Sequence, residues 1–232
     1  MPATNALLAS LSVADMAALR PHLKAVDLLS KRLLYEQGAT IREVYFPTGS
    51  VISLVVTLST GEMVEAAMVG KDGAVGAAAA LDGKISLSRA IVQLGGPAFT
   101  CEVNALATVA FQSRNVISAV IRHEQIVYAQ AQQSAACMGT HDVQSRLCRW
   151  LLRARDLAGT DHLPFTQEFL AEMIGVTRSS VTLVALSLQH AGIIKYSRGK
   201  IEIINLEGMQ DSACECYAAI KSNYSRLIEE RH

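Results

Sequence analysis

The spacing of apolar residues changes twice along this 232-residue chain. Residues 12–24 carry apolar side chains at helical spacing behind Ser12, a favourable N-cap, and so predict a short amphipathic helix. Between residues 28 and 111 the helical spacing is lost, and short runs rich in valine and isoleucine alternate with glycine-containing breaks. Many short strands separated in this way are typical of a sandwich or barrel.

One hairpin is evident within that region. Residues 51–58 and 63–68 are apolar runs, and the residues between them are turn formers that include a glycine. Residues 85–94 predict a further strand. We therefore expect an α+β chain whose residues 1–112 form a β-roll, of the double-stranded β-helix or jelly-roll type, preceded by the short helix.

Residues 113–138 contain neither glycine nor proline and return to helical spacing, which predicts one long helix. A helix of about 26 residues is about 39 Å long, and its narrow apolar stripe must lie against something. The partner is either the β-domain of the same chain or the same helix of a second copy, and the spacing alone favours neither. The stripe consists of Ile117, Val120, Val127, Ala131, Ser134 and Met138.

Residues 139–142 predict a hinge, because Gly139 interrupts the helical pattern. A second helix follows over residues 143–158 and ends at Gly159. Its arginines, at positions 146, 149 and 153, share one face, which we interpret as solvated, while Leu147, Trp150, Leu151 and Ala154 form the core-facing stripe. Residues 207–232 have helical spacing again and form a C-terminal tail to which the pattern assigns no function.

Residues 165–184 satisfy the restrictions of a helix-turn-helix motif. Two helices that cross closely need a small residue at the contact, a residue tolerant of a left-handed backbone in the turn, and an N-cap for the second helix. Ala171, Gly175 and Thr177 meet these needs in order. The apolar residues that would hold the two helices together are Leu170, Ile174, Val176, Val181 and Val184.

The second of these helices begins with short or forked hydrogen-bond donors, as expected of a helix that reads bases in the major groove. These residues are Arg178, Ser179, Ser180 and Thr182. A small hairpin follows over residues 193–204, and its basic tip would place Arg198 and Lys200 against phosphates. The sequence thus predicts a winged helix-turn-helix domain over residues 143–206 that binds double-stranded DNA.

The distribution of charge agrees with this interpretation although the net charge is zero. Residues 143–205 hold 8 lysines and arginines against 5 acidic residues, whereas the rest of the chain is slightly acidic. No spacing typical of a nucleophile elbow, a phosphate-binding loop or a metalloprotease is present, so we do not expect an enzyme. No apolar run is long enough to span a bilayer, which leads us to expect a cytoplasmic protein without a membrane partner.

The five cysteines are irregularly spaced and do not predict a disulfide framework. Cys214 and Cys216 could bind a metal but lack an evident third ligand, and Gly139 disrupts the helical spacing between Cys137 and His141. We therefore interpret the cysteines as buried thiols and predict neither a metal site nor a cofactor.

The chain resembles the Crp/Fnr superfamily of bacterial transcription regulators over nearly its whole length. The stretches that carry the resemblance are residues 34–38, 41–47, 49–51, 166–188, 191–194 and 199–200. The resemblance implies a cyclic-nucleotide-binding-type β-roll as sensor domain, a dimerisation helix over residues 113–138 and a winged-helix reader. It also implies a homodimer on a near-palindromic operator, with RNA polymerase as a further partner.

Several site residues can be assigned by this resemblance. Arg178 matches the base-reading arginine of the family, while Ser179 and Leu183 depart from its usual glutamate and second arginine. The operator is therefore expected to differ from the best-known family site. Positions that usually touch phosphates are matched by Thr166, Gln167, Thr177, Arg198 and Lys200.

The effector cassette of the family matches poorly. Ala74 replaces the carboxylate that binds the ribose, and the order of Ser88 and Arg89 is inverted, which on a strand points Arg89 to the opposite face. The N-terminal cysteines of the iron–sulfur members are also missing. We expect an unknown small-molecule effector other than cyclic AMP, or none; its pocket would include Gly73, Ala74, Gly76, Ser88 and Arg89. The alternative is a small-molecule or redox sensor module whose helix-turn-helix mediates protein contacts.

Overall fold

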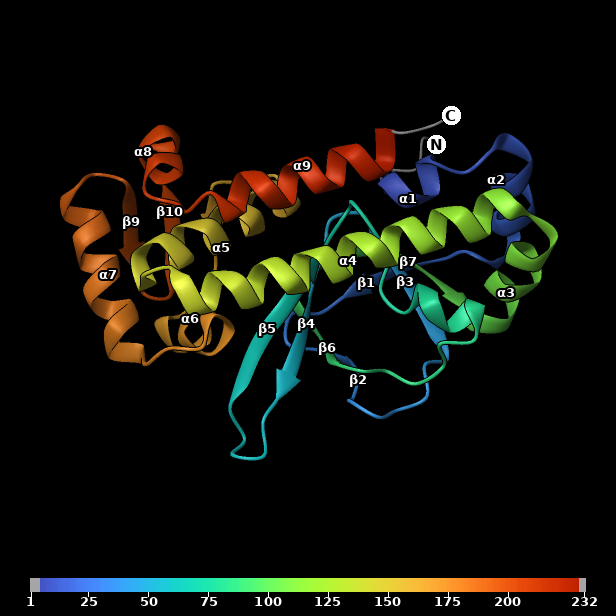
Figure 1. Ribbon diagram of the computed structural model, residues 1–232, viewed down its shortest axis with the longest axis horizontal. Helices are drawn as coiled ribbons and strands as arrows, with labels where there is room; N and C mark the ends of the chain where they lie inside the picture. Colours follow the sequence, from blue (N-terminus) through green and yellow to red (C-terminus); the bar gives the residue numbers. More distant parts are fainter. Residues whose placement is uncertain (1–4, 230–232) are drawn as a thin grey trace.

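The computed structural model describes residues 5–229, with side chains to residue 226. A β-rich domain and a helical domain lie at opposite ends of an elongated molecule, and helix α4 (Arg114–Thr140) runs along both (Figure 1). This arrangement confirms the predicted fold class, an N-terminal β-roll, a long helix and a C-terminal winged helix-turn-helix.

The β-roll consists of two antiparallel sheets, with the strand orders β1-β7-β3 and β2-β6-β4-β5. The predicted hairpin is formed by β4 and β5, which pair from Ile52 opposite Val69 to Thr57 opposite Met63. Ser12 caps α2 by accepting a hydrogen bond from the Asp15 amide, as its sequence position predicts. The elements are α1 (Ala6–Ala9), α2 (Val13–Leu19), β1 (Lys24–Leu28), β2 (Leu33–Tyr35), β3 (Glu43–Pro47), β4 (Val51–Thr57), β5 (Met63–Val69), β6 (Arg89–Leu94) and β7 (Gly96–Glu102), with short 3₁₀ turns at Arg20–His22 and Ala77–Leu81.

Two features of this domain differ from the sequence prediction. The strand expected from residue 85 begins only at Arg89, because residues 85–88 form a loop with a single bridge between Ile85 and Thr40. A separate helix, α3 (Val103–Gln112), follows β7 where only strands were expected. Its buried residues recur at helical spacing and pack into the same core as the sheets.

Helix α4 packs one face on the β-roll and leaves the opposite face open. Val120 and Ser134, two members of the predicted dimer stripe, are buried within the single chain. The exposed face instead carries Ile121 and Tyr128, which are seven residues apart. Ile117, Val127, Ala131 and Met138 of the predicted stripe are half-buried at its margins.

The expected hinge is shorter than predicted. Helix α4 continues through Gly139 to Thr140, and only His141 and Asp142 separate it from the next helix, α5 (Val143–Ala158). Asp142 caps α5 by accepting from the Ser145 amide at 2.9 Å, and Gly159 ends it in a left-handed conformation, as predicted.

The C-terminal domain is built on α5, whose Leu147, Trp150, Leu151 and Ala154 are buried as predicted. A three-stranded sheet of order β8-β10-β9 flanks the helix-turn-helix. The last helix, α9, folds back along α4 toward the β-roll, and Tyr224 donates its hydroxyl to the carbonyl of Asp72 (Figure 1). The elements are β8 (His162–Leu163), α6 (Gln167–Ile174), α7 (Arg178–His190), β9 (Ile194–Ser197), β10 (Lys200–Ile203), α8 (Leu206–Asp211) and α9 (Cys216–Glu229).

The two domains share a core. Val51, Val55, Met68 and Leu94 of the β-roll belong to the same apolar cluster as α5, α6 and α7. Within residues 5–229 no single helix has the length and apolar character needed to cross a membrane; only α6 and α7 taken together do, and they are bent by 110°.

Candidate nucleic-acid interface

The turn between α6 and α7 has the geometry that the sequence predicts. Thr166 caps α6 through a hydrogen bond from the Phe169 amide at 3.2 Å. Gly175 ends that helix with a φ of 62°, a conformation that side chains with a Cβ rarely adopt. The two helices are bent by 110°, as the motif requires, and Ala171 is buried.

The N-terminal end of α7 presents the predicted base-reading residues to solvent. Thr177 caps the helix and its hydroxyl lies 2.9 Å from the hydroxyls of both Ser179 and Ser180. The guanidinium of Arg178 is largely exposed, and its only ion pair in the described part of the chain is a contact of 3.7 Å with Glu168. Because such an exposed pair contributes little, this guanidinium is available to a ligand.

Two further predicted contacts lie beside this end. The hydroxyl of Thr182 donates to Gln167 Oε1 at 2.7 Å, and this hydrogen bond orients the amide group at the start of α6. Thr182 is half-buried, whereas the following residue, Leu183, has 70% of its surface exposed. This exposed leucine makes α7 able to form an apolar contact as well as hydrogen bonds.

The wing is a two-residue turn between β9 and β10, where Ser197 pairs with Lys200. Its central residues Arg198 and Gly199 have φ values of 49° and 75°, as in the type I′ turns that match the twist of a hairpin. The turn projects the side chain of Arg198 into solvent. It lies beside α6 and α7, since Thr166, Gln167, Arg178 and Arg198 line one shallow concavity.

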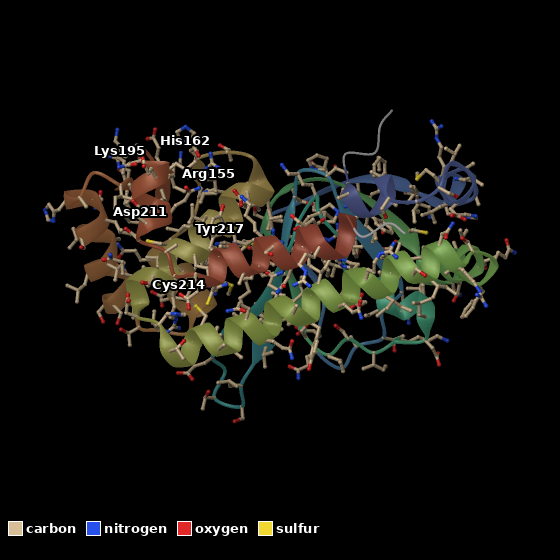
Figure 2. The ribbon with its side chains drawn as sticks, turned by 45° about the horizontal axis from the view of Figure 1, so that its top comes forward. Arg155, His162, Lys195, Asp211, Cys214 and Tyr217 are labelled. Carbon is tan, nitrogen blue, oxygen red and sulfur yellow. The ribbon has the colours of Figure 1, made fainter. Side chains whose placement is uncertain are left out.

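Several of the residues predicted to touch DNA thus line two hollows that share Arg198, and two further side chains that were not predicted lie beside them. Lys195 and His162 are exposed on the wing sheet and line a second hollow with Arg198 and Lys200; both project from that end of the molecule (Figure 2). Side chains two residues apart on a strand point to the same face, so Lys195 shares a face of β9 with Ser197 at the base of the wing turn. This alternation could have identified Lys195 as a wing residue from the sequence.

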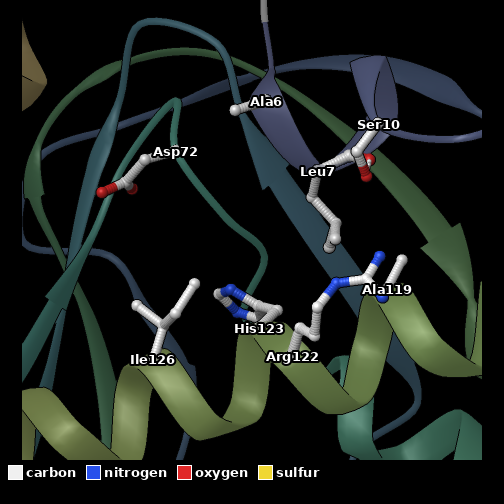
Figure 3. Close-up of a pocket in the computed structure, with 8 residues that line it drawn as sticks. All are labelled: Ala6, Leu7, Ser10, Asp72, Ala119, Arg122, His123 and Ile126. Atoms are coloured by element: carbon white, nitrogen blue, oxygen red, sulfur yellow. Dashed lines mark hydrogen bonds between the residues drawn. The ribbon is translucent and has the colours of Figure 1, made fainter. Parts of the chain in front are cut away.

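Two of the residues predicted for an effector pocket, Gly73 and Ala74, pack against α4. Gly73 abuts His123 of α4 so closely that an added Cβ would overlap the imidazole ring. The main chain of Ala74 is also in contact with this ring, whose Nε2 lies 2.6 Å from its carbonyl oxygen. Around His123, residues of α1 and α4 enclose a cavity of about 20 Å³, which is room for one water molecule (Figure 3).

The other members of that set lie apart from this cavity. Arg89 forms an ion pair with Glu36, with Nε and Oε2 3.2 Å apart, and also contacts Met63. Ser88 lies in the loop before β6, and an added Cβ on Gly76 would contact the hydroxyl of Tyr35.

The arginines of α5 do not form the solvated face that the sequence suggested. Arg146 and Arg149 are buried, with only 9% and 6% of their surfaces exposed. Arg153 forms a largely buried ion pair with Asp72 of the β-roll. Arg146 donates to the carbonyl of Ile174, the last residue of α6. The interpretation was wrong because the residues that cover these side chains come from distant parts of the chain.

The cysteines are also arranged differently from the sequence interpretation. The prediction that Gly139 disrupts the helix between Cys137 and His141 is wrong, because α4 continues through Gly139 to Thr140. The start of α9 brings Cys214 and Cys216 close to Cys137 and His141. Burial raises the pKa of Cys137 and raises the pKa of Cys214 to about 12. Both thiols therefore keep their protons at neutral pH unless a cation displaces them.

Comparison with known proteins supports the assignment of the motif. Residues 145–212 match the family model of the Crp-like helix-turn-helix domain. No curated protein matches the sequence.

Solved structures extend the likeness to the whole fold. FixK2 from Bradyrhizobium japonicum superposes with a TM-score of 0.71 at 15% identity, covering 83% of this chain and 98% of that one. TTHB099 from Thermus thermophilus, a transcriptional regulator of the CRP family, superposes with a TM-score of 0.68 at 19% identity, covering 82% of this chain and 96% of that one. TTHA1359 from the same organism, a transcriptional regulator of the CRP/FNR family, superposes with a TM-score of 0.67 at 20% identity, covering 82% of this chain and 98% of that one. The resemblance seen in the sequence is confirmed: the chain carries a Crp-like helix-turn-helix domain within the fold of the Crp/Fnr transcription regulators.

Proposed function

We propose that this protein is a sequence-specific DNA-binding transcription regulator of the Crp/Fnr type, acting as a homodimer. The observation that carries the proposal is the exposed N-terminal end of α7, where Arg178 stands beside the wing residue Arg198 in one concavity. An α-helix fits the major groove, and an arginine at its start can donate two hydrogen bonds to a guanine.

The residues around this end divide into two roles. Arg178, Ser179, Ser180 and Thr182 point from α7 and are assigned to bases, while the wing and the start of α6 are assigned to phosphates. Three of the phosphate residues, Thr166, Gln167 and Thr177, lie at helix N-termini, where main-chain amides add to the attraction for an anion. Arg198 and Lys200 contribute positive charge from the wing, and Lys195 extends this positive surface along the wing sheet.

Dimerisation is assigned to the open face of α4. Ile121 and Tyr128 expose 47% and 66% of their surfaces and lie one heptad apart, the repeat by which two helices pair. Exposed aromatic and aliphatic side chains on one helix face are typical of an interface. A two-fold pair of this kind presents two α7 helices to successive major grooves, about 34 Å apart, on a near-palindromic site.

The residues predicted for an effector pocket support control by something other than a cyclic nucleotide. Ala74 offers no carboxylate, its main chain contacts His123, and Arg89 has the carboxylate of Glu36 as a neighbour. We propose that any small effector acts elsewhere in the β-roll or that the protein binds DNA without one.

Selection from random duplex DNA tests the function. The full-length protein is expected to enrich a site with two related half-sites, and the same selection with Arg178→Ala should lose the preference at one position of each half-site. Arg32→Ala, which removes an exposed arginine from the β-roll, serves as the matched control and should enrich the wild-type site. A protein that uses its helix-turn-helix only for protein contacts would enrich no sequence, and that result would refute the proposal.

A further inference from the structure

Four potential metal ligands meet where α4, α5 and α9 converge. Cys137 lies in the last turn of α4, His141 just after that helix, Cys214 just before α9, and Cys216 is the first residue of α9. Their four ligand atoms all lie within 4.8 Å of one another, although 77 residues separate Cys137 from Cys214. Cys214 marks this place near the start of α9 (Figure 2).

The distances within the group suit a single tetrahedral ion. The sulfurs of Cys137 and Cys214 are 3.5 Å apart, and the sulfur of Cys216 lies 3.6 Å from His141 Nδ1. Zinc bonds of about 2.3 Å to sulfur and about 2.0 Å to nitrogen place tetrahedral ligand atoms about 3.5–3.8 Å apart. An iron–sulfur cluster needs more room, because its iron and sulfide atoms lie between the ligands.

The surroundings of the group are those of a metal site. His141 turns Nδ1 toward Cys216, while its other nitrogen, Nε2, lies 3.1 Å from a carboxylate oxygen of Glu215. A carboxylate on the outer nitrogen is the usual means of orienting a metal-bound histidine. Gln133 adds a hydrogen bond from Nε2 to the sulfur of Cys216 at 3.0 Å, which fits a sulfur that carries negative charge.

The local charges also favour an occupied site. Arg146 and Arg149 are buried beside Cys137, and Arg149 Nε has no hydrogen-bond partner among the described residues. Three thiolates, a neutral histidine and a divalent cation together carry a charge of −1, which compensates part of the two guanidinium charges. Three neutral thiols would provide no compensation beyond that of Asp142 near Arg146 and Glu65 near Arg149.

We propose that Cys137, His141, Cys214 and Cys216 bind one Zn²⁺ ion, which fastens α9 to the junction between α4 and the DNA-binding domain. Arg146 extends this link, because it lies beside the thiols and donates to the carbonyl of Ile174 immediately before the turn of the helix-turn-helix. The ion therefore supports the orientation in which α7 is held. The metal binding stands by itself, and the link to DNA rests on the proposed function.

The first experiment measures metal in the full-length protein purified under reducing, oxygen-free conditions. We expect one zinc per chain, and Co²⁺ added to the zinc-free protein should give the visible bands of tetrahedral thiolate coordination. Cys214→Ser and Cys137→Ser should lose these bands. Cys101→Ser, which changes an equally buried thiol in β7, should keep both the stoichiometry and the spectrum.

The orienting role of Glu215 gives a second readout that does not depend on removing a ligand. Glu215→Gln leaves all four ligands in place and is expected to weaken zinc affinity about tenfold, as removal of such a partner commonly does. Unchanged affinity would overturn the assignment of Glu215. Absence of bound zinc and of a Co²⁺ spectrum in the wild-type protein would overturn the site, as would iron with sulfide in its place or a Cys137–Cys214 disulfide under the same conditions.

The second experiment tests the link to DNA by removing zinc from the wild-type protein with a chelator. We expect a lower melting temperature and weaker operator binding, by a factor within about 5 to 150, the usual range of coupling between two sites. Equal affinity with and without zinc would overturn the link. If the zinc-loaded protein bound no duplex at all, the proposed function would fail while the zinc stoichiometry still stood.

Discussion

The indole of Trp150 donates its N–H to the carboxylate of Glu65 at 2.9 Å, across the boundary between the DNA-binding domain and the β-roll. Both side chains are buried, and Ser53 of β4 donates to the other carboxylate oxygen at 2.6 Å. Burial raises the pKa of Glu65 to about 7, although Arg149 and Arg153 lie near enough to oppose the shift. The two domains therefore meet at a group that titrates near neutral pH.

The stability of the protein should depend on pH through Glu65. The folded protein keeps a proton that the unfolded chain loses above its ordinary pKa of about 4.5, so the free energy of unfolding should fall as pH rises from about 4.5 to about 7. At about 1.4 kcal/mol per pKa unit the fall is on the order of 3 kcal/mol. Denaturant titrations across this range check the slope, and Glu65→Gln should flatten it. A slope equal to that of the wild type would show that another group controls it.

Arg178→Ala and Lys200→Ala should weaken DNA binding in different ways. Loss of Arg178 is expected to cost about 1–3 kcal/mol on the operator and little on random DNA, because it removes a base contact. Loss of Lys200 should weaken both, and should lower the slope of log affinity against log salt by about 1, because it removes a phosphate contact. Fluorescence anisotropy titrations at several salt concentrations separate the two. If Arg178→Ala reduced binding to both DNAs equally, the arginine would not be a base reader.

Leu183 should read a thymine methyl group. It is largely exposed on α7, five residues after Arg178, and a leucine can contact the C5-methyl group that only thymine presents in the major groove. Replacing operator thymines by uracil, one position at a time, should weaken binding by the wild-type protein at one position in each half-site. The Leu183→Ala protein should bind the thymine and uracil forms of the operator equally. A wild-type protein indifferent to every replacement would exclude the contact.

The open face of α4 should hold the dimer together. Ile121→Glu and Tyr128→Glu place a charge where two copies would bury apolar surface, so each is expected to shift the protein toward the monomer and to reduce operator affinity. Sedimentation equilibrium measures the change. Leu87→Glu, at an exposed leucine in the loop before β6, is the control and should remain a dimer. A monomeric wild-type protein would refute the assignment directly.

The helix-turn-helix could be predicted from sequence because its requirements are local. Thr166, Gly175 and Thr177 each act on backbone groups within a few residues, so caps and turn appear in the sequence itself. The environments of Arg146 and Arg149 could not be predicted, because residues far along the chain bury them. The same holds for Cys137 and Cys214, which meet only because α9 folds back along α4.

In the β-roll too, contacts between distant parts of the chain could not be predicted from the sequence. Helix α3 was missed because its apolar residues follow directly on those of β7, and a short apolar run does not distinguish a helix from a strand. Val120 of the predicted dimer stripe is buried in the apolar cluster of the β-roll, and Ser134 is buried within the chain, so neither lies on the open face of α4. Spacing identifies the apolar positions of a helix, and the tertiary fold decides which of them remain open.

Cyclic nucleotides should not bind the β-roll. The cyclic phosphate would need a guanidinium, and that of Arg89 already has an anionic neighbour in Glu36, with Nε and Oε2 3.2 Å apart. The ribose would need a carboxylate where the chain has Ala74, and the cavity beside His123 has room for only one water molecule. Isothermal titration calorimetry with cyclic AMP and cyclic GMP is therefore expected to give no heat of binding. Glu36→Ala provides the matched test, because it frees Arg89 while Ala74 remains, so it too should bind neither nucleotide. Micromolar binding by the wild-type protein would show that the β-roll opens to admit a ligand that its packing here excludes.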